Sequence, residues 1–396
     1  MNTIDDFNFN GKRALVRVDY NVPLNAEFVV TDDSRIMASL PTLNKILTDG
    51  GSLVLMSHLG RPKGEINLKY SLHHILDHVS ELLKRKVLFG GDCIGNEALE
   101  MSRNLKAGEV MLLENLRFYN EEEKGDMDFS RKLSQMGDIY VNDAFGTAHR
   151  AHASTTIVAN FFPGKKCAGY LMKNEVDSIE KVLKGAKKPV TAIIGGAKVS
   201  DKVLIIDKLL DIVDNLLIGG GMAYTFIRAE GGKIGKSLVE EDRIELAGQL
   251  MKKAESKQVK LLLPHDSVVA DAFSNDAHIK NENSHQIGDD WMGLDIGNES
   301  AAKYAEVIAA SSTILWNGPM GVFEFSNFQN GSKTVANAIA KATSKGAFSL
   351  IGGGDSVSAI HTFGLADQVS YISTGGGAML EFLEGKELPG VKALRE

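Results

Sequence analysis

The sequence predicts an α/β protein of two domains, each built on a parallel sheet flanked by helices. Short runs rich in Val, Ile and Leu alternate with segments of helical periodicity from one end of the chain to the other, a pattern typical of parallel sheets covered by helices. At 396 residues the chain also exceeds the roughly 100 to 200 residues of one domain.

The first half contains several apolar runs short enough to be buried strands. They lie at residues 14–18, 53–57, 110–113 and 139–142. An amphipathic helix is predicted after the first strand, with a stripe formed by Ile36, Leu40, Leu43 and Leu47. Pro41 lies inside this helix, where we expect it to remove a hydrogen bond and favour a kink. Ser71 is the predicted N-cap of a second helix.

In the second half, apparent strands are separated from apparent helices by runs of glycine. Bare backbone at the start of a helix lets a phosphate approach free N–H groups at the positive end of the helix dipole. Several such turns at the carboxyl edge of one parallel sheet would build a nucleotide site. The runs are Gly195-Gly196, Gly219-Gly220-Gly221, Gly352-Gly353-Gly354 and Gly375-Gly376-Gly377.

Composition and charge exclude several classes of protein. A net charge of -7 argues against a nucleic-acid or membrane surface, since both favour broad positive potential. Cys93 and Cys167 are the only cysteines and form no C-x-x-C pair, so neither a disulfide framework nor a zinc site is expected. The N-terminal residues lack the apolar core of a secretory signal, and a reducing cytoplasm fits best.

Polar and charged side chains of the first half follow the predicted strand ends, which converge on one crevice in a parallel sheet. Each alone is more simply a solvated surface charge, but several cations together on an acidic protein indicate a phosphorylated metabolite. The set is Arg17, Asp19, Asn21, Arg35, His58, Arg61, Arg117, His149, Arg150 and His152.

Two lysines and one aspartate suggest phosphate chemistry in the second half. Lys198 and Lys202 are four residues apart, so a helix beginning there would place both on one face, either over a phosphate or simply exposed. Asp355 follows a glycine run, where it could hold Mg²⁺ or act only as a helix N-cap. The Gly-Lys-Ser at residues 235–237 fails the P-loop spacing because Glu230 replaces the first glycine, so an ordinary helix-terminating loop is favoured.

Nine ordered segments, covering nearly the whole chain, together resemble the phosphoglycerate kinase family. Tyr20 is a departure, since the family more often has Phe there. The segments are VRVDYNVPL (16–24), SHLGRP (57–62), ENLRF (114–118), NDAFGTAHRAH (142–152), GGAKVSDK (195–202), GGGMA (219–223), WNGPMGVFE (316–324), GGGDS (352–356) and STGGGA (373–378).

The resemblance implies two Rossmann-like lobes joined by a hinge helix. The boundary is placed by a polar, lysine-bearing helix at residues 172–184, which is followed by Gly185 and Pro189 and is interpreted as a connector. We therefore expect a triose-phosphate-binding domain at 1–171, the hinge helix at 172–185, a nucleotide-binding domain at 186–378 and a segment that returns to the first domain at 379–396. The implied reaction is reversible in-line transfer from 1,3-bisphosphoglycerate to ADP, giving 3-phosphoglycerate and ATP in glycolysis or its reversal, with hinge closure.

The resemblance also implies a role for individual residues. For the triose these are Asp19, Asn21, Arg35, His58, Arg61, Arg117 and Arg150. For the nucleotide they are Lys198, Lys202, Gly219, Gly220, Asn317, Pro319, Glu324, Gly352, Gly353, Gly354, Asp355 and Ser356. The implied catalytic groups are Arg35, Lys202, Gly376 and Gly377, with Asp355 holding Mg²⁺.

The chemistry implied here needs no general base, because the carboxylate acceptor is already ionised at neutral pH. In-line positioning and neutralisation of phosphoryl charge are required instead. Another acyl-phosphate kinase and a non-catalytic phosphometabolite-binding protein remain alternatives. A cytoplasmic monomer without nucleic-acid or membrane partners is expected.

Overall fold

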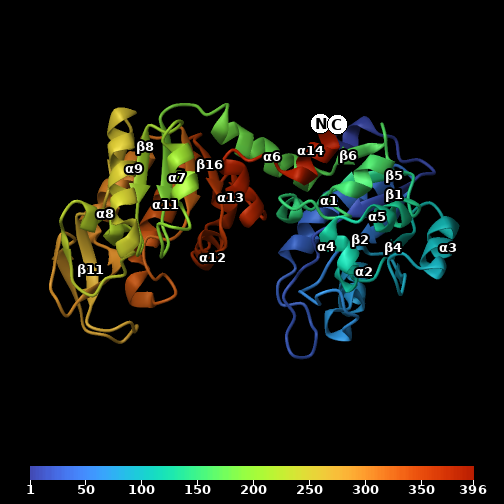
Figure 1. Ribbon diagram of the computed structural model, residues 1–396, viewed down its shortest axis with the longest axis horizontal. Helices are drawn as coiled ribbons and strands as arrows, with labels where there is room; N and C mark the ends of the chain where they lie inside the picture. Colours follow the sequence, from blue (N-terminus) through green and yellow to red (C-terminus); the bar gives the residue numbers. More distant parts are fainter. The chain divides into compact units, whose positions relative to one another are not determined.

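The computed structural model describes residues 1–396, and the chain divides into two compact units. The first unit comprises Met1–Asp177 and Glu387–Glu396, and the second is Ser178–Lys386. Each unit contains a six-stranded parallel sheet flanked by helices, so the predicted fold class is confirmed (Figure 1). Helix α6, Tyr170–Leu183, carries the chain from the first unit into the second.

The first sheet has the strand order β3-β4-β2-β1-β5-β6, and all of its pairs are parallel. Every predicted strand is present within one residue of its expected limits. A core cluster joins alternate residues of the central strands, such as Val16 and Leu55, to Ile36 and Leu43 of the first helix. The strands are β1 Arg13–Arg17, β2 Ser52–Met56, β3 Val87–Phe89, β4 Val110–Leu112, β5 Ile139–Asn142 and β6 Lys166–Ala168.

The helices of the first unit follow the expected apolar periodicity. Helix α1 buries Ile36, Leu43 and Leu47 and includes Pro41 in its interior. The Ser71 hydroxyl accepts from the N–H of His73 and caps a short 3-10 helix, η3 Leu72–Ile75, directly before α2. The helices are α1 Ser34–Thr48, α2 Leu76–Leu83, α3 Asn96–Asn104, α4 Asn120–Lys124, α5 Met127–Ser134 and α14 Pro389–Arg395.

Both chain ends lie beside the edge strand β6 of the first unit (Figure 1). Thr3 forms a parallel bridge with Ala168, whose N–H donates to the carbonyl of Asn2 at 3.0 Å. Helix α14 contacts β6 as well, and the N–H of Gly390 donates to the carbonyl of Ala148 at 2.8 Å. The returning segment begins at residue 387, whereas 379 was predicted, because α13 (Gly377–Leu383) packs on α7 (Val203–Leu209) in the second unit.

The second sheet has the order β10-β8-β7-β15-β16-β17, again with all pairs parallel. Its strands are β7 Val190–Ile194, β8 Asn215–Ile218, β10 Lys260–Leu262, β15 Thr313–Asn317, β16 Phe348–Ile351 and β17 Tyr371–Ile372. Besides α7 and α13, the helices are α8 Ala223–Ala229, α9 Ile244–Ser256, α10 Asn298–Ala309, α11 Asn330–Ser344 and α12 Gly354–Thr362. None of these or the other helices has the length and apolar character of a bilayer-spanning segment.

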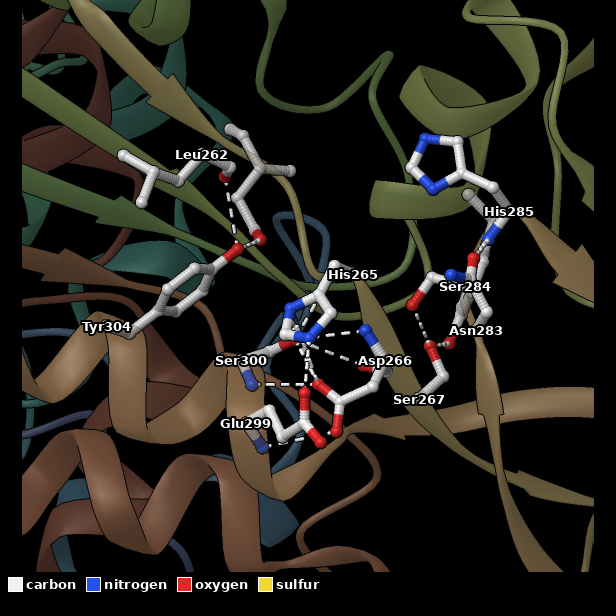
Figure 2. Close-up of polar contacts among 12 residues, drawn as sticks. Leu262, His265, Asp266, Ser267, Asn283, Ser284, His285, Glu299, Ser300 and Tyr304 are labelled. Atoms are coloured by element: carbon white, nitrogen blue, oxygen red, sulfur yellow. Dashed lines mark hydrogen bonds and ion pairs between the residues drawn. The ribbon is translucent and has the colours of Figure 1, made fainter.

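Two smaller sheets in the second unit were not predicted. Strands β11 Asp266–Ala270, β12 Ile279–Asn283 and β14 Met292–Ile296 form an antiparallel sheet, and β9 Lys233–Ile234 pairs with β13 Gln286–Ile287. Figure 2 shows how α10 is fixed between β11 and the main sheet. The Asp266 carboxylate accepts from the N–H of Ser300 at 2.7 Å, and the Tyr304 hydroxyl donates to the carbonyls of Ile218 and Leu262.

Candidate active site

Polar side chains at the carboxyl ends of β1 and β2 form a connected cluster in the first unit. The Arg35 guanidinium donates to the Asp19 carboxylate at 2.9 Å and to the carbonyl of Asn21 at 3.3 Å. The Asn21 side-chain oxygen accepts from the N–H of Gly60 at 2.8 Å. Arg117 donates to the carbonyl of the same glycine at 3.1 Å. Segments far apart in the sequence therefore hold two guanidinium groups at one edge of the sheet.

His58 lies among the cations of this cluster. Its Nδ1 is 3.1 Å from Nη2 of Arg17, and its side chain is almost fully buried. Burial lowers the pKa of His58 well below its usual range, and the charges of Arg17, Arg117 and Arg35 lower it further. Burial is also the main cause that lowers the pKa of Arg117. His58 is therefore a neutral ring in a positive field, whereas the sequence-based prediction counted it as a cation.

The remaining residues predicted for this site differ in exposure. Arg61 and Arg150 are exposed, and the charge of Arg150 acts on Arg117 and on His152. His152 has a pKa lowered to about 4, mainly by burial and then by Arg117 and Arg17. Arg17 is fully buried, so it faces the protein interior and not solvent.

A cavity of about 490 Å³ lies in the second unit, where β7, β8 and β15 end. Four residues predicted to bind nucleotide line it: Gly220, Pro319, Glu324 and Asp355. A smaller cavity of about 200 Å³ contains more of them, and Asp355 lines both. Its predicted residues are Lys202, Asn317, Gly353, Gly354, Asp355, Ser356, Gly376 and Gly377.

Lys202 reaches from the start of α7 to the side-chain oxygen of Asn317, to which its ammonium donates. Burial lowers the pKa of Lys202, while the charges of Asp201 and Asp355 raise it. The Asn317 amide donates to the carbonyl of Gly352 at 2.8 Å, and this links the strand ends of β15 and β16. The cavity thus presents an ammonium group and a carboxylate beside the starts of α12 and α13.

Glycine is required where the loops after β7 and β15 cross. A Cβ on Gly195 would lie 2.0 Å from the carbonyl oxygen of Pro319, and one on Gly318 would lie 2.1 Å from that of Gly195. Only glycine permits this approach. At the start of α13, Gly376 has φ +50°, a left-handed conformation that other residues rarely adopt.

One detail of the predicted phosphate site is wrong. Lys198 and Lys202 do not share a helix face, because α7 begins at Val203 and Lys202 is its N-cap. The preceding segment is held in a turn, since Ser200 donates through its N–H and its hydroxyl to the Glu240 carboxylate at 3.0 and 2.6 Å. Lys198 is exposed and lines neither cavity, and Gly219 and Gly352 pack against Met320 and Met379.

Sequence reasoning missed the apolar wall of the larger cavity. Leu238 and Phe273 are 48% and 64% exposed, which is unusual for large apolar side chains, and both line the cavity. Their loops carry no motif, so no sequence pattern indicated these two residues. Lys236, in the loop interpreted as an ordinary helix-terminating segment, also lines the cavity and pairs with Asp290 at 3.0 Å. The further apolar lining residues are Met292, Leu294 and Val322.

An ammonium group and a carboxylate next to two helix starts suit a chain of phosphates. The fold and this cavity are those of an α/β protein that binds nucleotide phosphates, the class to which α/β phosphotransferases belong. The particular family follows from comparison with known proteins: the family model described as phosphoglycerate kinase matches residues 4–386. The chain belongs to the phosphoglycerate kinase family, which transfers phosphoryl groups to a carboxyl acceptor.

Relatives and solved structures agree over the whole chain. The phosphoglycerate kinase of Porphyromonas gingivalis is 55% identical, covering 99% of this chain and 100% of its own. "Phosphoglycerate kinase 3, cytosolic" of Arabidopsis thaliana is 52% identical, covering 100% of this chain and 98% of its own. The solved structure of phosphoglycerate kinase from Coxiella burnetii has a TM-score of 0.90 at 39% identity, covering 99% of this chain and 98% of that one.

Proposed function

We propose that this chain catalyses reversible phosphoryl transfer between 1,3-bisphosphoglycerate and ADP, with the triose bound on the first unit and the nucleotide on the second. The observation that supports it most is the cavity shared by Lys202, Asp355 and the starts of α12 and α13. A coupled assay with 3-phosphoglycerate and MgATP tests the proposal. Turnover with acetate or carbamate in its place would favour another acyl-phosphate kinase, and binding without turnover would favour a binding protein.

On the first unit, we assign the triose to the connected cluster. Asp19 and Asn21 contact the glycerate, while His58, Arg61, Arg117 and Arg150 bind its 3-phosphate, and Arg35 faces the transferring group. Support comes from the hydrogen bonds that Arg35 donates to Asp19 and to the carbonyl of Asn21, which hold the guanidinium at the ends of β1 and β2. Guanidinium groups suit a phosphate because they donate in bidentate fashion.

On the second unit, Lys198, Lys202 and the glycine-rich turns bind the nucleotide phosphates. Adenine occupies the larger cavity, where Phe273 and Leu238 supply apolar surface and Glu324 meets the ribose hydroxyls. The carboxylate acceptor is ionised at neutral pH, so the protein needs to move no proton. Catalysis then rests on alignment and on positive charge placed where negative charge spreads during transfer, from Arg35, Lys202 and the N–H groups at Gly376 and Gly377.

Replacing Lys202 with alanine tests its catalytic role. We expect kcat to fall by about 10² or more with a smaller change in KM, because the ammonium acts mostly in the transition state. Lys333, which is exposed on α11, provides the control, and Lys333→Ala should leave both constants unchanged. Steady-state kinetics decide, and an unchanged kcat in Lys202→Ala would remove Lys202 from the chemistry.

Asp355 is the residue that we assign to Mg²⁺. It lines both cavities from the first turn of α12, and a single carboxylate suits Mg²⁺ that is bound together with nucleotide phosphates. The ion, when bound, would neutralise negative charge on the phosphate oxygens. We expect Asp355→Ala to weaken binding of MgADP and not of ADP in the presence of EDTA. Titration calorimetry compares the two, and an equal loss in both would contradict the assignment.

We also propose that the units close around the two substrates, with α6 taking part in the hinge. Reacting atoms must approach to within roughly 3 to 3.5 Å, and exclusion of water protects the acyl phosphate from hydrolysis. Small-angle scattering should show compaction only with both substrates bound, and unchanged scattering would count against closure.

A cytoplasmic monomer is the proposed state of the protein. Two relatives are named as cytosolic, from Triticum aestivum and Arabidopsis thaliana, and both cysteines of this chain are free and buried. Light scattering after gel filtration should give the 42.8 kDa mass of one chain. A mass near twice that value would overturn the monomer.

A further inference from the structure

Arg17, the last residue of β1, is a guanidinium group with no access to solvent. Its Nε donates to the Ser154 hydroxyl at 2.9 Å, its Nη1 donates to the carbonyl of Val18, and its Nη2 lies 3.1 Å from Nδ1 of His58. Removing such a charge from water is costly unless it is paired and hydrogen-bonded. A charge buried this deeply cannot reach a ligand itself, so its effect must pass through its neighbours.

The contact between Arg17 and His58 fixes the protonation of the histidine ring. A guanidinium group has only N–H donors, so Nδ1 of His58 has to accept and carries no proton. The proton of the neutral ring is then on Nε2, the one nitrogen left to meet a ligand. An imidazolium, or the tautomer with its proton on Nδ1, would place two N–H groups against each other.

Behind Arg17 lies a buried carboxylate that the nucleotide and triose assignments do not use. Glu122 in α4 is fully buried, and it accepts from the Ser154 hydroxyl at 2.6 Å and from the Ser154 N–H at 2.9 Å. The Ser154 hydroxyl therefore accepts from Arg17 and donates to Glu122. A chain of hydrogen bonds joins a counter-charge on α4 to the guanidinium on β1 and to the ring at the end of β2.

We propose that Arg17 and Glu122 are positioning residues, which hold His58 as a neutral ring whose Nε2–H is donated to the phosphate of the triose substrate. The inference rests on the proposed function for its ligand, but the tautomer itself is a property of the protein without substrate. His58 thus contributes a directed hydrogen bond, while the positive charge comes from the arginines.

Several charged groups face the His58 ring. Arg17 approaches from β1, Arg35 from α1 and Arg117 from η4 (Leu116–Phe118), while His152, in the loop before η6 (Ile157–Phe161), has a pKa of about 4 and is uncharged above pH 6. The three guanidinium groups disfavour a proton on the ring, and the Glu122 carboxylate is separated from it by Ser154 and Arg17. The contribution of His58 to substrate binding is therefore expected to stay constant from about pH 6 to pH 8.

Nitrogen-15 NMR of the histidine side chains tests the proposal directly on the whole protein. The signals of His58 are identified by their loss in His58→Gln. We expect Nδ1 to have the shift of an unprotonated nitrogen and Nε2 that of an N–H, without titration between pH 6 and pH 8, and Nε2 to move on addition of 3-phosphoglycerate. An imidazolium or the Nδ1–H tautomer in this range would overturn the proposal without any variant of Arg17.

Variants then separate positioning from simple stabilisation. Arg17→Met should let the proton of the neutral His58 ring occupy Nδ1 as well as Nε2, which moves the two nitrogen shifts toward each other, and should raise KM for 3-phosphoglycerate on the order of 10-fold, the value of one hydrogen bond to a charged group. Glu122→Gln, which keeps the shape of the side chain, should shift the His58 nitrogen signals in the same direction as Arg17→Met does, but by a smaller amount. Arg13→Met is the control, because Arg13 is on the same strand but pairs with Asp138. Unchanged His58 signals in a folded Arg17→Met would also overturn the proposal.

These outcomes distinguish the two levels of inference. If the coupled assay shows no turnover and 3-phosphoglycerate does not change the nitrogen-15 shift of Nε2, the proposed function fails. The nitrogen shifts of the protein without substrate still determine the tautomer of His58. If turnover is present and His58 is an imidazolium, the proposed function stands and the positioning role of Arg17 fails.

Discussion

Asp143 is a carboxylate buried at the start of α6. Its Oδ1 accepts from the N–H of Met172 at 3.1 Å, and its Oδ2 has no hydrogen-bond partner. Burial raises the pKa of Asp143 to about 7, although hydrogen bonds from Thr42 and from the backbone of α6 oppose this. The carboxyl group at the beginning of the connecting helix therefore changes charge close to neutral pH.

This raised pKa predicts a pH dependence of stability. The folded protein holds the proton up to about pH 7, whereas the unfolded chain releases it near pH 4, so this contribution is complete below pH 4 and is lost as pH rises through 7. Between pH 5 and pH 8, the wild type should lose about 3 kcal/mol more than Asp143→Asn. Urea unfolding followed by circular dichroism measures it. Asp77→Asn, at an exposed site, should behave like wild type.

The sequence motifs predicted where the site residues lie, but they did not predict the protonation state of His58. The carboxyl-end rule for parallel sheets correctly brought Asp19, Asn21 and Arg35 together. The neutral state of His58 depends on a contact with a residue 41 positions away, and a local pattern does not contain that contact. Phe273 could not be assigned for the same reason, since its neighbours come from distant loops.

Among the elements, the glycine-rich turns were predicted correctly because the need for glycine arises from the local backbone conformation. A turn that needs positive φ or close backbone approach selects glycine wherever it occurs. The start of α7 was predicted too early, since the competing contact from Ser200 to Glu240 spans 40 residues. The antiparallel strands β11, β12 and β14 were missed altogether, and β12 is mostly exposed and polar.

Gly376→Ala tests the helix start of α13. Alanine at φ +50° is strained by roughly 1 to 3 kcal/mol and should turn the N–H groups away from the phosphoryl group, so kcat should fall about 10-fold or more. Gly346→Ala is a matched control, because Gly346 has φ +98° and no atom within 4 Å of a Cβ, but lies in the turn after α11. Both variants should lose similar stability in thermal unfolding. An equal loss of kcat in both would assign the effect to strain alone.

The whole molecule consists of a second unit inserted into the first. Residues 178–386 form one continuous unit, and the first unit is completed by Glu387–Glu396. Leu388, Val391 and Leu394 of this last segment are almost fully buried. Chain length predicted two domains, and the family resemblance predicted that the last residues return to the first one. Periodicity alone could not predict that return, because an apolar stripe does not specify its partner.

Deleting residues 387–396 should destabilise the first unit and leave the second unchanged. Loss of three buried side chains removes roughly 5 to 9 kcal/mol of hydrophobic stabilisation, at roughly 1.5 to 3 kcal/mol each. Trp291 and Trp316 both belong to the second unit, so tryptophan fluorescence reports on that unit alone. We expect circular dichroism to show an earlier transition while the fluorescence midpoint stays fixed.

If the deletion prevents folding, a point variant tests the same prediction. Leu394→Ala should lower stability by about 2 to 5 kcal/mol in the same probe, and Lys392→Ala, which is half exposed on the same helix, should not. A coincident shift of fluorescence in Leu394→Ala would mean that the units do not unfold separately.

The position of α14 also sets an order of events during synthesis. A ribosome makes a chain from its amino end, and domains generally fold as units while it does so. Here the strands of the first sheet emerge before any of the second, yet the helix that covers β6 is translated only after the whole second unit. The first unit, although synthesised first, therefore keeps the edge around β6 uncovered until the second unit has been synthesised.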